Sequence, residues 1–298
     1  MGILIKSPEF NLNKVEMSSG DIDKLINQYT RLQVGGSVEG ISSVTTNIVY
    51  GLGDYLVKLA NNLKTVVTGA LKDVKRSELQ LTIDKHRLSY TRLNRADYSE
   101  VFKGSTGFYP FKKDPASVAA FCHDEFKRLK MGSRLPEIAD CYHILSSSIG
   151  SGDSSKTIAM IEKINGLNVP ANSSSIKSQL EEMIVVHIPT KLSTIGATFD
   201  SVSDITSAVT STLSSEDELN QAVSVGKRLN HLYEGFEGIQ KALHVNLDKG
   251  HDISSLKGLP QMVKDTGELI ESYAMLVREY HHLDHYLSVV LGSAISRL

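Results

Sequence analysis

Apolar side chains recur every three or four residues over most of the chain, a spacing that puts them on one face of an α-helix. The first stripe covers 41–71, and a shorter one continues it over 79–93. The sequence "GLGD" at 51–54 interrupts the first stripe, and glycine costs a helix interior about 1 kcal/mol. The pattern therefore predicts one long helix or two. The first stripe consists of Ile41, Val44, Ile48, Leu52, Leu56, Leu59, Leu63, Val66 and Leu71, and the second of Leu79, Ile83, His86, Tyr90 and Leu93.

The helical pattern stops at 103–115, "KGSTGFYPFKKDP", which contains two Gly, two Pro and three aromatic residues. Gly and Pro favour turns, so we expect a structured loop whose aromatic side chains pack onto the helices. Asp114 followed by Pro115 predicts the start of a helix, because aspartate caps the free N–H groups and proline needs no partner at the first position. The sequence "GSRLPE" at 132–137 predicts the end of that helix and the start of another over about 136–148.

Two polar segments, "SSSIGSGDSSK" at 146–156 and "NGLNVPANSSS" at 165–175, flank one short predicted helix. We place a domain boundary there. It separates an N-terminal helical region, residues 1–150, from a C-terminal bundle of long helices, residues 151–298. The two regions could also form one continuous domain.

Three further stripes follow in the C-terminal region. The sequence "SSEDEL" after the first of them predicts a helix start, with Ser215 as the capping residue and acidic residues in the first turn. The last helix is predicted over about 260–296. The stripes are Leu192, Ile195, Phe199, Val202, Ile205, Val209 and Leu213; then Leu219, Val223, Leu229, Leu232, Phe236, Ile239, Leu243 and Leu247; then Leu259, Val263, Ile270, Tyr273, Val277, Tyr280, Leu283, Leu287 and Leu291.

Alternation with a period of two, the mark of a strand, is almost absent. The sequence therefore predicts an all-α fold in which long antiparallel helices form an elongated bundle. Ser, Thr and Gly are frequent beside the apolar positions. Small residues let helices approach closely but bury less apolar area, so we expect packing against other subunits to add stability.

Composition narrows the class of protein further. The chain has no Trp and two Cys, Cys122 and Cys141, which are too few for a disulfide framework. No apolar run reaches the roughly 18 to 20 residues that a membrane span needs, and "MGILIKSPEF" lacks the pattern of a signal peptide. We therefore expect a protein made in the cytoplasm with no membrane partner.

The formal net charge of −2 hides an uneven distribution of charge along the chain. Residues 64–134 contain 15 Lys or Arg and 8 Asp or Glu, whereas 135–298 contain 12 and 20. Faces of opposite charge could complement each other within the chain or between copies of it. Alternatively, they could meet different partners, and the basic region 64–134 is then the candidate for a nucleic-acid contact.

The sequence "GSGDSSKT", Gly150 to Thr157, resembles the phosphate-binding loop GxxxxGK[ST]. Gly150, Lys156 and Thr157 fit this pattern. Ser155 replaces the second glycine, whose positive φ lets the loop amides converge on phosphate. The segment before it reads as a helix and not as a strand. The alternative interpretation is a turn in which Asp153 or Ser154 caps the next helix.

Two groups of residues could bind a metal ion. Cys122–His123 and Cys141–Tyr142–His143 contain zinc ligands, but adjacent positions on a helix point about 100 degrees apart, so core cysteines are the better interpretation. "VREYHHLDHYLSVV" at 277–290 contains three histidines, of which His281 and His285 share the flank of the apolar stripe. His282 turns toward the polar side. Asp284 could reach His281, whereas Arg278 would repel a cation.

The start "MGILIKSPEF", the missing Trp and the Ser/Thr-rich stretch "STIGATFDSVSDITSAVTSTLSS" resemble the helical minor structural proteins of tailed bacteriophage particles. The resemblance implies a virion component without catalysis, with basic residues 64–134 facing packaged DNA. The residues themselves favour a structural or interaction subunit that self-associates or contacts assembly neighbours and needs no cofactor. The alternative is a helical enzyme or metal-binding protein that uses His281 and His285 or the segment Gly150–Thr157.

Overall fold

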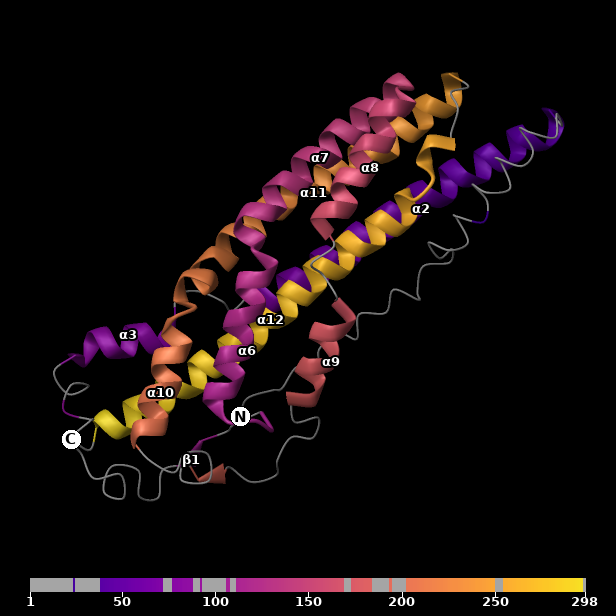
Figure 1. The fold of residues 1–298 in the computed structure, drawn as a ribbon. Helices are drawn as coiled ribbons and strands as arrows, with labels where there is room; N and C mark the ends of the chain where they lie inside the picture. Colours follow the sequence, from indigo (N-terminus) through magenta and orange to yellow (C-terminus); the bar gives the residue numbers. More distant parts are fainter. Residues whose placement is uncertain are drawn as a thin grey trace. The chain divides into compact units, whose positions relative to one another are not determined.

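The structure is a computed structural model, and all statements about it concern the residues that it describes: 24, 38–71, 77–87, 92, 106–107, 111–168, 173–183, 193–194, 202–249 and 254–296. The all-α class is confirmed, with several long helices packed against one another (Figure 1). The helices are α2 (Val38–Leu71), α3 (Glu78–Lys85), α6 (Pro115–Leu129), α7 (Met131–Ser151), α8 (Ser154–Asn168), α9 (Ser173–Met183), α10 (Val202–Leu213), α11 (Glu216–Lys249) and α12 (Leu259–Ile295). A 3-10 turn, η3 (Ser254–Leu256), and two strands, β1 (Thr106–Gly107) and β2 (Ser193–Thr194), complete the described elements.

The first apolar stripe forms one helix, α2, which continues through the glycines at 51 and 53. A new helix, α3, begins after Ser77, whose hydroxyl accepts a hydrogen bond from Gln80 N at 3.0 Å. The side chains of the stripe from Ile48 to Leu63 are buried, as the spacing predicts. The second stripe starts at buried Leu79, and its members Tyr90 and Leu93 lie outside the described residues.

Helix α6 begins as predicted, because Asp114 Oδ1 accepts a hydrogen bond from Ser117 N at 2.9 Å and Pro115 is the first helical residue. The helix ends at Leu129, and Lys130 adopts the left-handed conformation with φ 48°. Helix α7 then begins at once and contains Pro136. The predicted start near 136 was wrong. Pro136 is the sixth residue of α7, where it removes one backbone hydrogen bond, but the helix continues through it.

The described residues of the polar segments at 146–156 and 165–175 are mostly helical, contrary to expectation. Helix α7 runs to Ser151, and the break before α8 consists of Gly152 and Asp153, with φ 73° at Gly152. Helix α9 begins within the second segment and was not predicted. Residues 103–105 and 108–110 of the predicted loop at 103–115 lie outside the described residues. Its Phe111 is buried, and Lys112 N donates to Met183 O at 2.6 Å.

The short strands β1 and β2 pair in antiparallel register, with Thr106 opposite Thr194 and Gly107 opposite Ser193. The helical stripe expected from Leu192 is therefore wrong at these positions. Thr has weak helix propensity and pairs readily in a sheet. Leu192, Ile195 and Phe199 lie outside the described residues, and α10 carries the rest of the stripe.

The chain forms two compact units, each built from three separate segments. Unit 1 comprises Met1–Gly69, Ser133–Ala171 and Gly226–Glu271; unit 2 comprises Ala70–Gly132, Asn172–Val225 and Ser272–Leu298. The predicted boundary at 150/151 falls inside unit 1. Helices α11 and α12 contribute residues to both units.

Neighbouring helices of unit 1 run in both directions. A Cβ added to Gly53 of α2 would lie 3.4 Å from Gln240 Cγ of α11, and the Tyr50 and His244 rings of these helices lie 5.3 Å apart. Residue numbers therefore rise on α2 as they fall on α11, which makes this pair antiparallel. Between α7 and α11 the numbers rise together, since 142 lies against 235, 146 against 238 and 150 against 242. This second pair is parallel.

Two glycines allow α7 and α11 to approach closely. A Cβ on Gly235 would lie 2.9 Å from Tyr142 Cβ, and a Cβ on Gly238 would lie 2.8 Å from Ser146 Oγ. Both distances are too short for a Cβ contact, so a larger residue at either position would force the neighbouring atoms of α7 to move. The close approach confirms the expectation that small residues line the helix seams.

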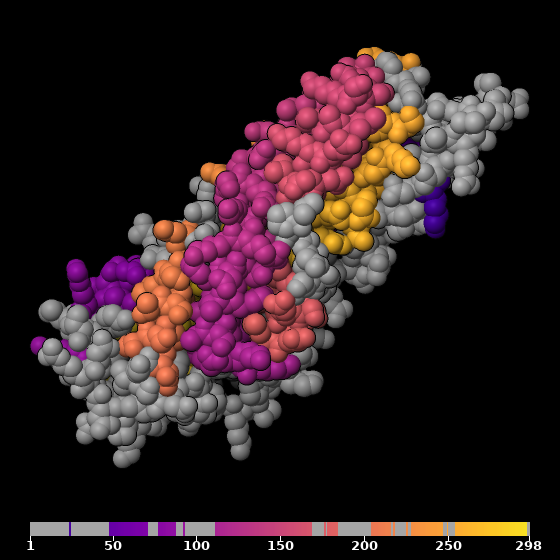
Figure 2. All heavy atoms as spheres, viewed as in Figure 1, coloured from indigo at the N-terminus to yellow at the C-terminus, as the bar shows by residue number. Residues whose placement is uncertain are grey.

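Buried polar groups join the helices of unit 1. Tyr142 Oη and Thr266 Oγ1 lie 2.9 Å apart, and Asn168 Nδ2 donates to the same Thr266 oxygen at 2.9 Å. Asn246 Nδ2 donates to Ile149 O at 3.0 Å. Figure 2 shows α8 in pink beside α7 in magenta and beside the first part of α12 in orange-yellow. Hydrogen bonds in such an interior fix the register of the helices as well as their contact.

The core of unit 2 is built around Phe126 of α6. Its ring makes edge contacts with Tyr273 at 6.0 Å and Tyr280 at 5.5 Å, both from α12. The Tyr280 hydroxyl donates to Thr212 O of α10, which satisfies a polar group that is otherwise enclosed. Every member of the predicted apolar stripe of α12 is buried.

The uneven distribution of charge along the sequence is not kept in the two folded units, each of which is close to neutral. Unit 1 contains 15 basic and 17 acidic residues, and unit 2 contains 17 of each. Most of the basic stretch, residues 70–132, lies in unit 2 together with acidic segments such as 216–218. Among the described helices, none is long and apolar enough to cross a membrane.

Candidate functional site

The three histidines of α12 in unit 2 have different surroundings. His285 is exposed, and its Nδ1 lies 2.7 Å from Glu78 Oε2 of α3. His282 is also exposed, and its Nδ1 lies 3.2 Å from Glu279 Oε2. His281 is partly buried. In the part of the chain that the structure describes, these histidines are not brought together with other ligands into a group that could hold a metal ion.

Glu279 is the buried centre of an ionic group on α12. Its side chain is 4% exposed, and the guanidinium of Arg278 lies 2.7 Å from its Oε1. Burial raises the pKa of Glu279, but the contacts with His282 and Arg278 lower it by more. The pKa of Glu279 is therefore below its ordinary value. Arg278 thus compensates a buried carboxylate.

Asp284 caps α3 instead of approaching His281. Its carboxylate accepts hydrogen bonds from Ser77 Oγ at 2.5 Å and from Glu78 N at 2.7 Å. The residue is fully buried, and burial raises its pKa to about 6 despite the hydrogen bonds from Ser77, Glu78 and Leu79. The expected contact with His281 was wrong, because Asp284 faces the N-terminus of a helix, where a negative charge is favourable.

The segment Gly150–Thr157 forms a helix–turn–helix and not a strand–loop–helix. Asp153 Oδ1 accepts a hydrogen bond from Lys156 N at 3.0 Å and so caps α8. The Thr157 hydroxyl is buried and donates to Ser148 Oγ at 3.0 Å. The hydrogen bond from Lys156 N to Asp153 confirms the interpretation as a capped turn.

Both cysteines are buried free thiols, as expected for core residues. Burial raises the pKa of Cys122 far above its ordinary value, and burial likewise raises that of Cys141. Thiols in this state are poor nucleophiles and poor metal ligands. The Ser215 hydroxyl at the start of α11 lies 2.7 Å from Nδ1 of His123, the residue after Cys122.

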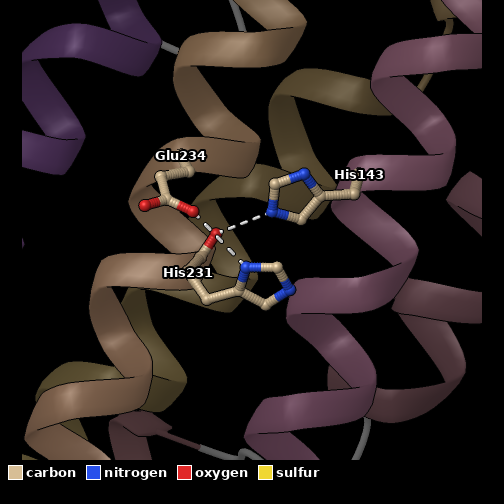
Figure 3. Close-up of side chains that lie close together, drawn as sticks. All are labelled: His143, His231 and Glu234. Atoms are coloured by element: carbon tan, nitrogen blue, oxygen red, sulfur yellow. Dashed lines mark hydrogen bonds and ion pairs between the residues drawn. The ribbon is translucent and has the colours of Figure 1, made fainter.

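A different group of side chains gathers on unit 1. Nitrogen and oxygen atoms of His143 on α7 and of His231 and Glu234 on α11 all lie within 4.8 Å of one another. No motif in the sequence indicates this group. Figure 3 shows the three side chains turned toward one another from the two helices.

The contacts within this group are specific. The rings of His143 and His231 stack with centroids 4.1 Å apart and planes 22° apart, and His143 Nε2 lies 3.0 Å from the backbone oxygen of His231. His231 Nδ1 lies 3.5 Å from Glu234 Oε2, while its Nε2 lies 3.2 Å from Asp140 Oδ1. His231 thus contacts a carboxylate through each ring nitrogen.

The local sequence explains how each helix places two of these four side chains on one face. Asp140 and His143 are three residues apart on α7, as are His231 and Glu234 on α11, and side chains at this spacing share one face of a helix. The glycine at 235 brings the two faces together. The paired spacing is visible in the sequence, but which helices lie side by side is not.

Comparisons of the chain with protein-family models, with curated protein sequences and with solved structures find no match.

Proposed function

We propose that the chain is a structural subunit that associates with copies of itself in a larger protein assembly. The observation that carries the proposal is a set of exposed apolar side chains on the surface that α2 and α11 share in unit 1. Tyr50 is 59% exposed on α2, and Val57, two turns further on, is exposed on the same side of that helix. Val245 of α11 is also exposed and directly follows His244, whose ring contacts Tyr50.

Three properties of this surface favour a contact with another protein. Tyrosine is enriched at interfaces, where it combines a large apolar area with a polar end. The surface lies on two long helices, which can pack against the same helices of a second copy about a two-fold axis. The near-neutral charge of unit 1 adds little repulsion between two copies.

The buried ionisable and polar groups also support a structural role. Asp284 holds the end of α3, and Thr266 joins α7, α8 and α12. These groups serve the packing of helices. They are therefore better suited to a rigid scaffold than to proton transfer.

For the kind of assembly, we propose a virion, on the strength of the resemblance of the sequence to helical minor structural proteins of bacteriophages. Immunogold labelling of purified particles with an antibody against the chain tests this choice. Labelled particles support it, and label confined to the particle-free fraction contradicts it.

Replacing Tyr50 by serine is expected to weaken self-association about tenfold or more, because truncating a large aromatic residue at an interface costs on the order of 2 kcal/mol. Sedimentation velocity over a concentration series measures the effect. Leu81→Ser on α3 is the control, since Leu81 is 50% exposed and lies on unit 2. A wild-type chain that stays monomeric at all concentrations, or equal effects of both substitutions, would contradict the proposal.

A further inference from the structure

We infer that His143, His231 and Glu234 bind one zinc ion on the surface of unit 1. The three residues supply two imidazole nitrogens and one carboxylate oxygen. This is a recognised ligand set for Zn²⁺, which takes three protein ligands and a water molecule in open sites. The site is independent of the proposed self-association.

The spacing of the ligand atoms suits a small tetrahedral ion. Bonds of about 2.0 to 2.1 Å place tetrahedral ligands about 3.3 Å apart. His231 Nδ1 and Glu234 Oε2 are already 3.5 Å apart. The remaining atoms lie within 4.8 Å, and His231 and Glu234 are exposed side chains that can turn inward.

Asp140 orients the central ligand. Its Oδ1 lies 3.2 Å from His231 Nε2, so that this nitrogen can donate a hydrogen bond to the carboxylate while Nδ1 faces the ion. A carboxylate behind a metal-bound imidazole fixes the tautomer and increases the basicity of the ligand. Asp140 is therefore a positioning residue and not a ligand.

The charges at the site balance when a divalent cation is bound. Two neutral imidazoles, the Glu234 carboxylate and the Asp140 carboxylate carry two negative charges, which one Zn²⁺ neutralises. Binding exchanges the hydrogen bond between His143 Nε2 and the backbone oxygen of His231 for a bond to the metal. The rings must also open from their stacked arrangement, which makes the affinity moderate.

Isothermal titration calorimetry of the purified chain with Zn²⁺ tests the inference. We expect one ion per chain, and an affinity reduced about tenfold or more in His143→Asn, His231→Asn and Glu234→Gln. Asp140→Asn should weaken binding in the same direction without changing the thermal midpoint of the metal-free protein. Zn²⁺ should raise the midpoint of the wild type and not that of His231→Asn.

His282→Asn and His285→Asn are the matched controls, because both histidines are exposed and lie beside a glutamate on unit 2. They should bind Zn²⁺ as the wild type does. Two results would overturn the inference: no binding by the wild type, or binding that survives His143→Asn and His231→Asn. If the affinity is lost instead in His285→Asn, the metal site lies on α12.

Discussion

Replacing Gly235 by valine is expected to lower the free energy of unfolding by about 3 kcal/mol, the upper end of the cost of overpacking a helix interface. The added Cβ would lie 2.9 Å from Tyr142 Cβ, an atom attached directly to the α7 backbone that no side-chain rotation can move. The helices must therefore separate. The separation would also pull His143 away from His231.

Urea denaturation monitored by circular dichroism measures this decrease in the free energy of unfolding. Gly166→Val is the matched control, because a Cβ on this α8 glycine meets nothing within 4 Å. Its effect should stay within about 0.5 kcal/mol. Gly238→Ala should fall between the two, since the atom that its Cβ meets, Ser146 Oγ, can rotate away. Equal stabilities of the Gly235 and Gly166 variants would contradict the close approach of α7 and α11 at Gly235.

The second large effect is a dependence of stability on pH that arises from Asp284. Its pKa is raised from an ordinary 3.8 to about 6 in the folded chain. Between these values the folded state keeps a proton that the unfolded state has released. Stability from this group is thus present below pH 3.8 and is lost as the pH rises to about 6, in total about 3 kcal/mol.

Comparison with Asp284→Asn isolates this contribution, because asparagine resembles the protonated carboxyl group and does not titrate. The free energy of unfolding of the wild type minus that of the variant should fall as the pH rises from 4 to 6.5, and should then stay level. Urea titrations at several pH values provide the measurement. A difference that is constant with pH, or that grows with it, would show that Asp284 carries its ordinary pKa or a lowered one.

Several elements of the fold could be predicted because their causes are local. The stripe of α12 lies within one helix, so helical spacing alone identifies its buried side. The start of α6 depends on Asp114 and Pro115, which are adjacent. Helix α7 was placed incorrectly because its beginning depends on whether Pro136 ends a helix or is tolerated near its start, and packing decides between the two.

The candidate site could not be predicted from the sequence, because its residues are neighbours only in the folded chain. His143 and His231 are 88 positions apart and meet through the parallel packing of α7 and α11. His281, His282 and His285, in contrast, are close in sequence, but His282 and His285 turn to different carboxylates. Histidines that are close in sequence on one helix therefore do not bring their ring nitrogens together.

The parallel packing of α7 and α11 underlies both the glycine requirement and the histidine cluster, and one engineered disulfide tests it most directly. A Cβ at Gly150 would lie 3.6 Å from Ala242 Cβ, within the range of about 3.5 to 4.5 Å that disulfides require. Mild oxidation of the double variant Gly150→Cys, Ala242→Cys should therefore give an intramolecular cross-link that dithiothreitol releases. Ser146→Cys with Asn246→Cys should give none, because 146 lies against 238 in the parallel pair, and 146 would face 246 only if α11 ran antiparallel to α7 through the same contact. No cross-link in the first variant, or equal cross-linking in both, would contradict the parallel packing.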